Sequence, residues 1–445
     1  MSKKILFFFR LVLLCGLLEA CATGMSMDSA RIAYDQGDYV TALNYYREQA
    51  AGGNMEASFL VAQMYDQAVG VEKNNVEAQR YYKLAADNSY PGAALALATS
   101  YYFDEKYTEA RPYFERAAAA GNGVALYYLG EMSENGLGVS RDSQKALNYY
   151  QSASEANNGA AQYKLSEFYQ NGNGVRQDAE NAERFLRRAA ANGHPQAEYQ
   201  VANRVLDGRD TSIGSRQAVD WMKDAADNGV MEAQTIVGKM YNTGDRVDQD
   251  VMEAFKYFKM AAEQGDAEAQ YNLGNLYRQD QGIKRDLNEA MRWYKASADQ
   301  NYRAAEYDLG SMYYIGLGVD QNIKEATKWF LRAAEKGHPI AQYFLGNIYR
   351  TGQNVIKNDE EALKWYQKAA EQDIPEAQNN LGYMYANGQG TDRNYILAHM
   401  WFSISLVNDN LSAQQARQFI ETEMTEDEID EAENMARTWL ENHRQ

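Results

Sequence analysis

The residues AEAQYNLGNLY at 267–277 and NEAMRWYKASA at 288–298 decide the fold of this chain. Apolar side chains recur at helical spacing on one face of each stretch: Ala269, Leu273, Leu276 and Tyr277 in the first, and Ala290, Trp293, Tyr294 and Ala298 in the second. The two stretches therefore predict a helical hairpin. Its first helix is called helix A below, and its second is called helix B.

The aromatic pair of helix B repeats along almost the whole chain. Eleven residue pairs, all aromatic at the first position and nine of them aromatic at both, begin at Tyr45, Tyr81, Tyr113, Tyr149, Phe185, Trp221, Tyr257, Trp293, Trp329, Trp365 and Trp401. Nine of the ten intervals between them are 36 residues and one is 32. A period in this range is typical of stacked supersecondary units, so we predict an all-α solenoid of about eleven helical hairpins.

Glycine recurs in the middle of helix A, where it costs about 1 kcal/mol of helix propensity. The positions are Gly130, Gly238, Gly274, Gly310, Gly346 and Gly382. Because the cost is repeated, we interpret these glycines as close-contact positions where helix B crosses helix A.

The loops carry the signals of helix starts. An Asp or Asn is followed three residues later by Glu at Asn74/Glu77, Asp250/Glu253, Asp286/Glu289, Asn322/Glu325 and Asn358/Glu361. This is the spacing of a capping box, and its recurrence favours a structural role over a catalytic or calcium-binding one. Proline is predicted to open helix A at Pro91, Pro195, Pro339 and Pro375. His194 and His338, each followed by proline, are interpreted as turn residues.

Three motifs together, Leu-Gly-x-x-Tyr, Gly-x-Gly-Val-x-x-Asp and Ala-x-x-Trp-Tyr-x-x-Ala-Ala, resemble the Sel-1-like repeat, a relative of the tetratricopeptide repeat. The resemblance covers residues 28–407 and implies a right-handed superhelix with the A helices on its concave surface. The hairpins at 29–51 and 94–118 have short loops that are closer to the plain tetratricopeptide form. The hairpin at 197–226 lacks the usual loop, and we interpret it as a bend or soft joint.

The N-terminus resembles a bacterial lipoprotein signal. A basic start precedes an apolar run over 5–18, which is shorter than the roughly 20 residues that span a bilayer. LEAC at 18–21 resembles a lipobox, although Glu19 departs from its usual small or aliphatic residue. We predict Cys21 as the lipid anchor, with conventional cleavage after 20–22 as the alternative.

The residue after the anchor favours an outer-membrane lipoprotein that faces the periplasm, in a bacterial cell envelope. A soluble periplasmic or secreted protein is the alternative. The predicted segments are a signal peptide at 1–20, a short linker at 21–27, the repeat solenoid at 28–407 and a pair of C-terminal capping helices at 408–445, with Thr425/Glu428 as a further capping box.

Charge and cysteine content exclude several classes of function. The net charge of −18 disfavours nucleic acid and anionic lipid surfaces, so membrane contact is expected only through the N-terminal anchor. The only two cysteines, Cys15 and Cys21, leave the mature body without disulfides, a thiolate nucleophile or a cysteine zinc site. With four histidines and no convincing His-metal or Ser-His-Asp arrangement, we predict no enzyme activity, no metal and no cofactor.

The candidate binding residues follow from the resemblance, which implies that three positions of helix A point into the concave groove. They are Tyr271, Asn275 and Arg278 in one hairpin, Tyr307, Ser311 and Tyr314 in the next, and Tyr343, Asn347 and Arg350 in the third. Tyr and Arg are frequent in binding hot spots. The alternative is that the Tyr residues pack between neighbouring A helices.

Three functions remain open. The resemblance implies a non-enzymatic scaffold that binds protein partners of the cell envelope on the concave face, in assembly of an envelope or exopolysaccharide-export complex. The Tyr-rich groove alternatively suits glycan or peptidoglycan. A β-lactamase-type hydrolase is the third possibility, but the disulfide-paired cysteines of such relatives are lacking here.

Overall fold

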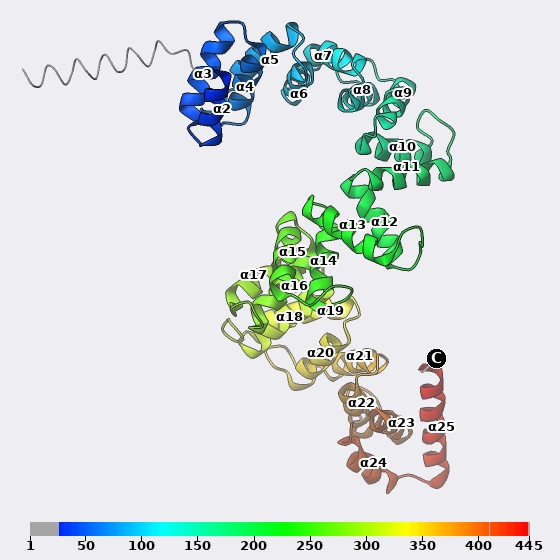
Figure 1. Cartoon of the computed structure of the whole chain (residues 1–445). Helices are drawn as coiled ribbons and strands as arrows, with labels where there is room; N and C mark the ends of the chain where they lie inside the picture. The colour runs from blue at the N-terminus through cyan, green and yellow to red at the C-terminus, as the bar shows by residue number, and fades with distance from the viewer. Residues whose placement is uncertain (1–25, 409, 444–445) are drawn as a thin grey trace, which may run out of the picture. The chain divides into compact units, whose positions relative to one another are not determined.

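The structure is a computed structural model that describes residues 26–408 and 410–443. Within these residues there are 24 helices and no strand, so the predicted all-α class is confirmed (Figure 1). The chain divides into two compact units, residues 1–214 and residues 215–445. The predicted signal peptide and the predicted lipid anchor, Cys21, lie outside the described residues.

The first unit contains five hairpins and a single helix. In chain order its helices are α2 (Met27–Asp35), α3 (Tyr39–Ala51), α4 (Met55–Asp66), α5 (Asn75–Asp87), α6 (Ala93–Phe103), α7 (Tyr107–Ala119), α8 (Gly123–Asn135), α9 (Ser143–Glu155), α10 (Gly159–Asn171), α11 (Ala179–Ala191) and α12 (Pro195–Leu206). Each helix packs on the one that follows it.

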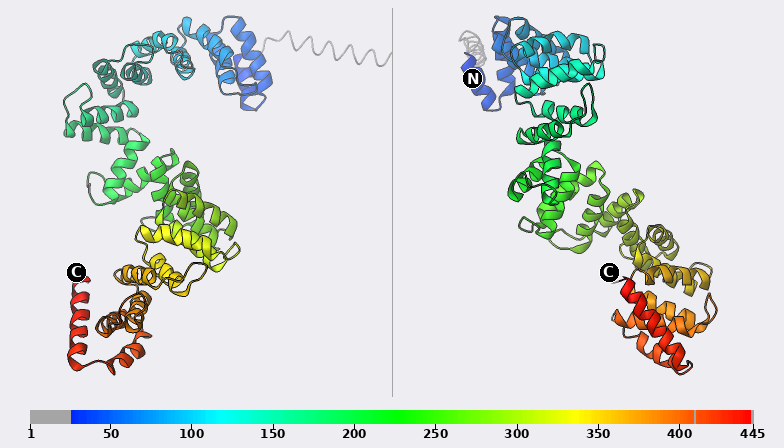
Figure 2. Two further views of the ribbon diagram at one scale, coloured as in Figure 1. Left: turned by 180° about the vertical axis from the view of Figure 1, so that it is seen from behind. Right: turned by 90° about the vertical axis from the view of Figure 1, so that its right-hand side faces the viewer.

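The second unit begins with α13 and continues the pattern through five hairpins and two terminal helices. They are α13 (Ser215–Asp227), α14 (Met231–Thr243), α15 (Val251–Gln264), α16 (Ala267–Gln279), α17 (Leu287–Asp299), α18 (Arg303–Ile315), α19 (Ile323–Glu335), α20 (Pro339–Thr351), α21 (Asp359–Ala370), α22 (Pro375–Asn387), α23 (Tyr395–Val407), α24 (Ala413–Glu421) and α25 (Glu426–His443). From α13 to α24 consecutive helices again lie side by side, and α25 packs on α23, so each unit is a repeat solenoid (Figure 2).

The mid-helix glycines are close-contact positions, as predicted. A Cβ atom added to Gly346 of α20 would lie 2.5 Å from the Tyr366 ring of α21. The rings that face the other five glycines are Tyr150, Phe258, Tyr294, Phe330 and Phe402, and the corresponding distances are all 2.5–2.8 Å. All six rings are fully buried, so each glycine lets helix B seat an aromatic side chain directly on the backbone of helix A.

The predicted caps form. In the described hairpins the Asp or Asn side chain accepts the capping hydrogen bonds, without the return bond from the Glu side chain. Asp286 Oδ1 accepts hydrogen bonds from the backbone N–H groups of Asn288 and Glu289, at 3.0 and 3.1 Å. The Glu289 carboxylate pairs with Arg292 at 2.6 Å. At the start of α25, Thr425 and Glu428 exchange both bonds of the capping box, at 2.8 and 3.3 Å.

Three of the four prolines occupy the predicted place. Pro195, Pro339 and Pro375 are the first residues of α12, α20 and α22. The prediction for Pro91 is wrong, because α6 begins at Ala93 and is preceded by Gly92 at φ +79°.

In five hairpins a hydrogen-bonded glutamine on helix A links the hairpin to the helix before it, which the sequence analysis did not anticipate. In α20, Gln342 Nε2 donates to the Ala334 carbonyl of α19 at 3.0 Å. Its Oε1 accepts from Gln372 Nε2, just beyond α21, at 2.7 Å. Equivalent glutamines donate in the same way at Gln162, Gln234, Gln270 and Gln378. Burial of this polar side chain is therefore matched by partners for both of its polar atoms.

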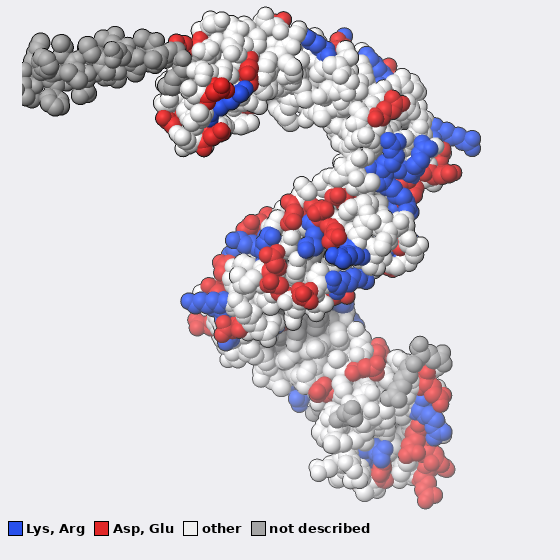
Figure 3. Space-filling model, in the orientation of Figure 1, with Lys and Arg blue, Asp and Glu red and all other residues white. Residues whose placement is uncertain are grey.

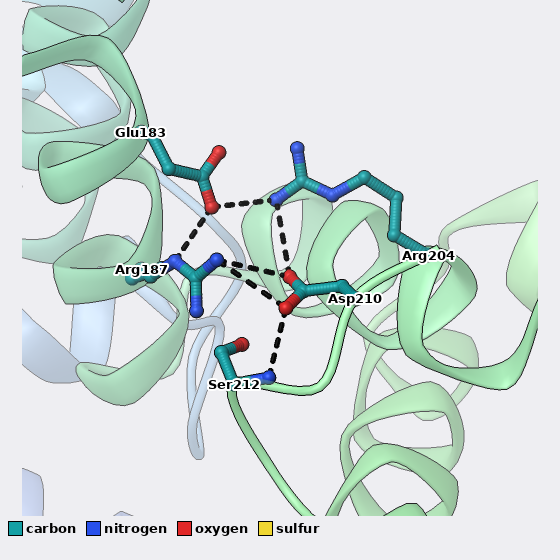
Figure 4. A network of polar contacts seen from close by, with 5 residues as sticks. All are labelled: Glu183, Arg187, Arg204, Asp210 and Ser212. Carbon is teal, nitrogen blue, oxygen red and sulfur yellow. Dashed lines mark hydrogen bonds and ion pairs between the residues drawn. The ribbon is translucent and has the colours of Figure 1, made fainter. Parts of the chain in front are cut away.

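The unusual loop at 207–214 is tied to the first unit by a charge network (Figure 4). Asp210 pairs with Arg187 of α11 at 3.1 Å and accepts from the Ser212 N–H at 2.8 Å. Glu183 bridges Arg187 and Arg204 at 2.6 and 2.9 Å. Burial opposes ionisation of Asp210, but the Ser212 hydrogen bonds and the two guanidinium groups lower its pKa. The division between the two compact units falls at the end of this loop.

Candidate functional site: the A-helix face of the second unit

The nine predicted binding residues lie on three successive A helices, and together they are called the A-helix face. Helix α16 carries Tyr271, Asn275 and Arg278, α18 carries Tyr307, Ser311 and Tyr314, and α20 carries Tyr343, Asn347 and Arg350. Eight of the nine are half-buried, and Arg350 is exposed. Neighbouring A helices meet here through Arg278 and Asp308, 3.9 Å apart, and through the rings of Tyr314 and Phe344, 5.2 Å apart.

The Tyr rings of the face pack against neighbouring rings. Tyr271 contacts Tyr294 at 5.8 Å and Tyr302 at 5.3 Å between ring centroids. Tyr307 stacks on His338 at 4.3 Å. Tyr294 belongs to helix B of the same hairpin, and Tyr302 and His338 cap the next A helices, so these rings pack both within a hairpin and against the hairpin that follows. Burial and the Asp308 charge raise the pKa of Tyr271 to about 12.

The two asparagines of the face bind a tyrosine hydroxyl of their own hairpin. Asn275 Oδ1 accepts from the Tyr294 hydroxyl, and Asn347 Oδ1 accepts from the Tyr366 hydroxyl, both at 2.7 Å. In the hairpin between them Phe330 replaces the tyrosine, and Ser311 Oγ is buried without a hydrogen-bond partner in the described part of the chain. Each asparagine therefore has one polar atom already engaged within the hairpin.

Charge on the face is set by two arginines and by an aspartate that the sequence analysis missed. Asp308 is only 8% exposed, and burial raises the pKa of its carboxyl against the opposing effect of Arg278. Arg350 Nε donates to the Tyr366 hydroxyl at 3.1 Å. Because this bond orients Arg350 while it remains exposed, its guanidinium is presented to a partner at a small loss of side-chain entropy.

Elsewhere in the second unit the structure brings a serine, a histidine and a carboxylate together. His399 Nε2 lies 2.9 Å from Glu421, and its Nδ1 lies 3.5 Å from Ser403 Oγ. The imidazole is fully buried, and Arg417 pairs with the same Glu421 at 3.2 Å. A buried ring between α23 and α24 cannot reach a substrate, so we assign this cluster to the packing of α24.

The described residues contain no group of three or more His, Cys, Asp or Glu residues that could hold a metal ion. Among the helices from α2 to α25, none combines the length and the apolar character that a membrane span requires.

His194 and His338, which were predicted to be turn residues, also cap helices. His338 Nδ1 accepts from the Ala341 N–H at 3.3 Å, and His194 Nδ1 accepts from the Ala197 N–H at 3.4 Å. Acceptance requires the neutral ring. Burial, aided by the Arg303 charge, lowers the pKa of His338 from its ordinary 6.5 to about 4, and burial lowers that of His194.

We therefore expect stability to fall as the pH falls from neutrality towards 4, because the unfolded chain takes up protons near pH 6.5 that folded His338 binds only near pH 4. The loss between pH 7 and 5 is about 1–2 kcal/mol for this site. In His338→Asn that part of the pH dependence should disappear, since Asn158 caps α10 through its Oδ1 without titrating. Urea midpoints at both pH values test this, and equal pH slopes in both proteins would refute it.

Comparison with known proteins settles the family. Ten consecutive segments match the Sel1 repeat family model, at residues 56–90, 92–122, 123–158, 159–194, 195–230, 232–266, 267–302, 303–338, 339–374 and 375–405. The chain belongs to the Sel1 repeat family. In this Sel1 repeat protein, the hairpin of α2 and α3 lies outside the matched segments, whereas the short-looped hairpin at 94–118 is matched.

Two solved structures are similar to this chain, and the first of them agrees with this family. The structure of c5321, a protective antigen of uropathogenic Escherichia coli strains displaying an SLR fold, is 27% identical and covers 90% of this chain and 95% of its own, with a TM-score of 0.65. A Sel1 repeat protein from Oxalobacter formigenes is 30% identical and covers 69% of this chain and 89% of its own, with a TM-score of 0.48.

One curated relative is similar over a shorter stretch. Chitin synthase regulatory factor 1 of Schizosaccharomyces pombe is 32% identical over 116 residues, which are 24% of this chain and 25% of the relative. The match therefore spans about a quarter of that relative's length. Sel1 repeat proteins are typically scaffolds for protein interactions, and this chain is a member of that family.

Proposed function

We propose that this Sel1 repeat protein is an envelope scaffold that binds a protein partner on the A-helix face of α16, α18 and α20. The observation that carries the proposal is the exposed Arg350, which is held by the Tyr366 hydroxyl, while the half-buried Tyr343 lies 6.2 Å from the Tyr366 ring between centroids. Arginine and tyrosine at the centre of a patch supply much of the binding energy of protein interfaces. One face of the Tyr307 ring is covered by His338, which favours a protein over a stacked sugar as the ligand.

Site-specific photo-crosslinking in cells tests the proposal. The probe replaces Arg350 on the A-helix face, and a matched control probe replaces Lys364, an exposed residue of α21. We expect one discrete protein adduct with the probe at 350 and none with the probe at 364. Adducts of equal yield at both positions, or none at 350, would contradict the assignment of this face.

The cellular location is part of the proposal. The lipobox-like stretch at 18–21 supports attachment of Cys21 to the outer membrane, with the repeats in the periplasm. There the scaffold would serve assembly of an envelope complex, such as an exopolysaccharide-export machine. The same crosslinking examines this location, because the adduct at 350 must then contain an envelope protein; a cytosolic partner would contradict it.

A further inference from the structure

The C-terminal helix α25 borders a shallow depression of about 750 Å³ that is largely open to solvent and that none of the functions above uses. The depression runs along one face of α25 from Asp427 to His443 and is completed by Met400 of α23. Its apolar lining comprises Met400, Met435 and Trp439, and its rim carries Asp427, Asp430 and Glu431. These six residues define what we call the C-terminal groove.

Buried contacts hold α25, which carries most of the apolar lining of the groove, in place. Ala432 and Ala436 are buried and hold α25 against the hairpin of α22 and α23. Trp439 contacts Trp401 edge to face at 5.6 Å and stacks on His443 at 3.9 Å. Methionine side chains such as Met435 adapt readily to a ligand surface, so the groove combines a rigid aromatic anchor with a deformable lining.

The rim of the groove is acidic, and its carboxylates are exposed to solvent. Helix α25 carries seven carboxylates and one arginine, and Figure 3 shows acidic residues crowded along this helix at the lower right. Glu289 and Glu325, by contrast, each pair with a cation three residues on. No side-chain hydrogen bond or ion pair joins Asp427, Asp430 or Glu431 to any other residue of the described chain. An apolar groove with free carboxylates on its rim is complementary to a cationic, partly apolar ligand.

We propose that the C-terminal groove binds a basic amphipathic helix of a protein partner. Its length, from residue 427 to residue 443, corresponds to about 24 Å of helix, enough for roughly four turns of a bound helix. Such a helix lays its apolar face into the groove, as in other helix-in-groove complexes, while its Lys and Arg residues face the rim. The net charge of −18 argues against a second copy of this chain and against anionic lipid as the occupant.

Calorimetric titration of the full mature chain with synthetic helical peptides tests the groove. The probe is an amphipathic peptide of Leu and Lys, and its counterpart replaces every Lys by Glu. The groove variant is Asp430→Lys with Glu431→Lys. The control is Glu426→Lys with Glu433→Lys, which makes the same charge change at exposed positions of α25 outside the groove.

We expect saturable binding of one Leu/Lys peptide per chain, weakened about tenfold or more in the groove variant and within about threefold of wild type in the control. The Leu/Glu peptide should not bind. Circular dichroism confirms that both variants keep their helices. Equal weakening in both variants would show diffuse charge attraction and overturn the proposal, as would binding of the Leu/Glu peptide or no saturable binding of the Leu/Lys peptide.

Discussion

We expect Gly346→Ala to destabilise the second unit by about 2–3 kcal/mol, although alanine is the better helix former by about 1 kcal/mol. The new methyl group would lie 2.5 Å from two carbons of the Tyr366 ring. That ring is fully buried and its hydroxyl is bonded to Asn347 and Arg350, so it has no free direction in which to move. Urea denaturation, with hydrogen exchange of the α20 and α21 amides, measures the loss.

Gly214→Ala is the matched control. Gly214 has an ordinary φ, and nothing lies within 4 Å of a Cβ added to it. We expect this substitution to change the free energy of unfolding by less than about 1 kcal/mol, because Gly214 directly precedes α13, where alanine is a poorer cap than glycine but meets no neighbouring atom. If Gly346→Ala were as neutral as Gly214→Ala, the close approach of helices A and B would not be the reason for the repeated glycine.

These glycines show what the repeat makes predictable. A residue that is unfavourable in a helix, yet recurs at one position of six hairpins, indicates a packing constraint shared by all of them. The same reasoning gave the caps at Asp286 and its equivalents, because the N–H groups at a helix start need acceptors wherever the helix lies. Both signals are local, so they do not depend on knowing how hairpins stack.

The contacts between hairpins were harder to predict. Gln342 and Gln372 are separated by 30 residues, and nothing in either residue alone names its partner. The signal that could have found this pair is recurrence, since glutamine occupies the position of Gln342 in five hairpins. Asp308 carried no such signal, because the equivalent residues Asn272 and Phe344 differ in charge and size.

Features that occur only once in the chain could not be predicted from the repeat. The loop at 207–214 was identified as a departure, but its anchoring by Arg187 and Arg204 required the positions of α11 and α12. The binding residues of the A-helix face stay a prediction. The structure shows where their side chains lie, and it shows that several of them are already engaged by neighbours, as Tyr307 is by His338.

We expect the second large effect at Glu306. This residue occupies the helix A position that is glutamine in the other four hairpins of the second unit, and it is the only charged residue at that position in the unit. Its carboxylate is fully buried and pairs with Arg332 at 2.8 Å and with Lys336 at 2.6 Å. A carboxylate cannot donate to the Ala298 carbonyl as Gln342 does to Ala334, and Arg332 donates there instead, at 2.7 Å. Glu306→Leu should therefore cost about 2–4 kcal/mol in urea denaturation, because it leaves two partly buried cations without their anion.

Glu306→Gln separates charge from shape. Glutamine fills this position in the neighbouring hairpins, so we expect a loss below about 1.5 kcal/mol: its Oε1 still accepts from Lys336, and its Nε2 faces the Ala298 carbonyl. Restoring the neutral pair with Lys336→Gln in the same chain should recover most of that loss, since Gln342 and Gln372 form this pair one hairpin further on. If the Leu and Gln variants were equally unstable, the packing of α18 on α17 would require the buried charge of Glu306. The hydrogen bonds that glutamine can make at this position would then not be sufficient.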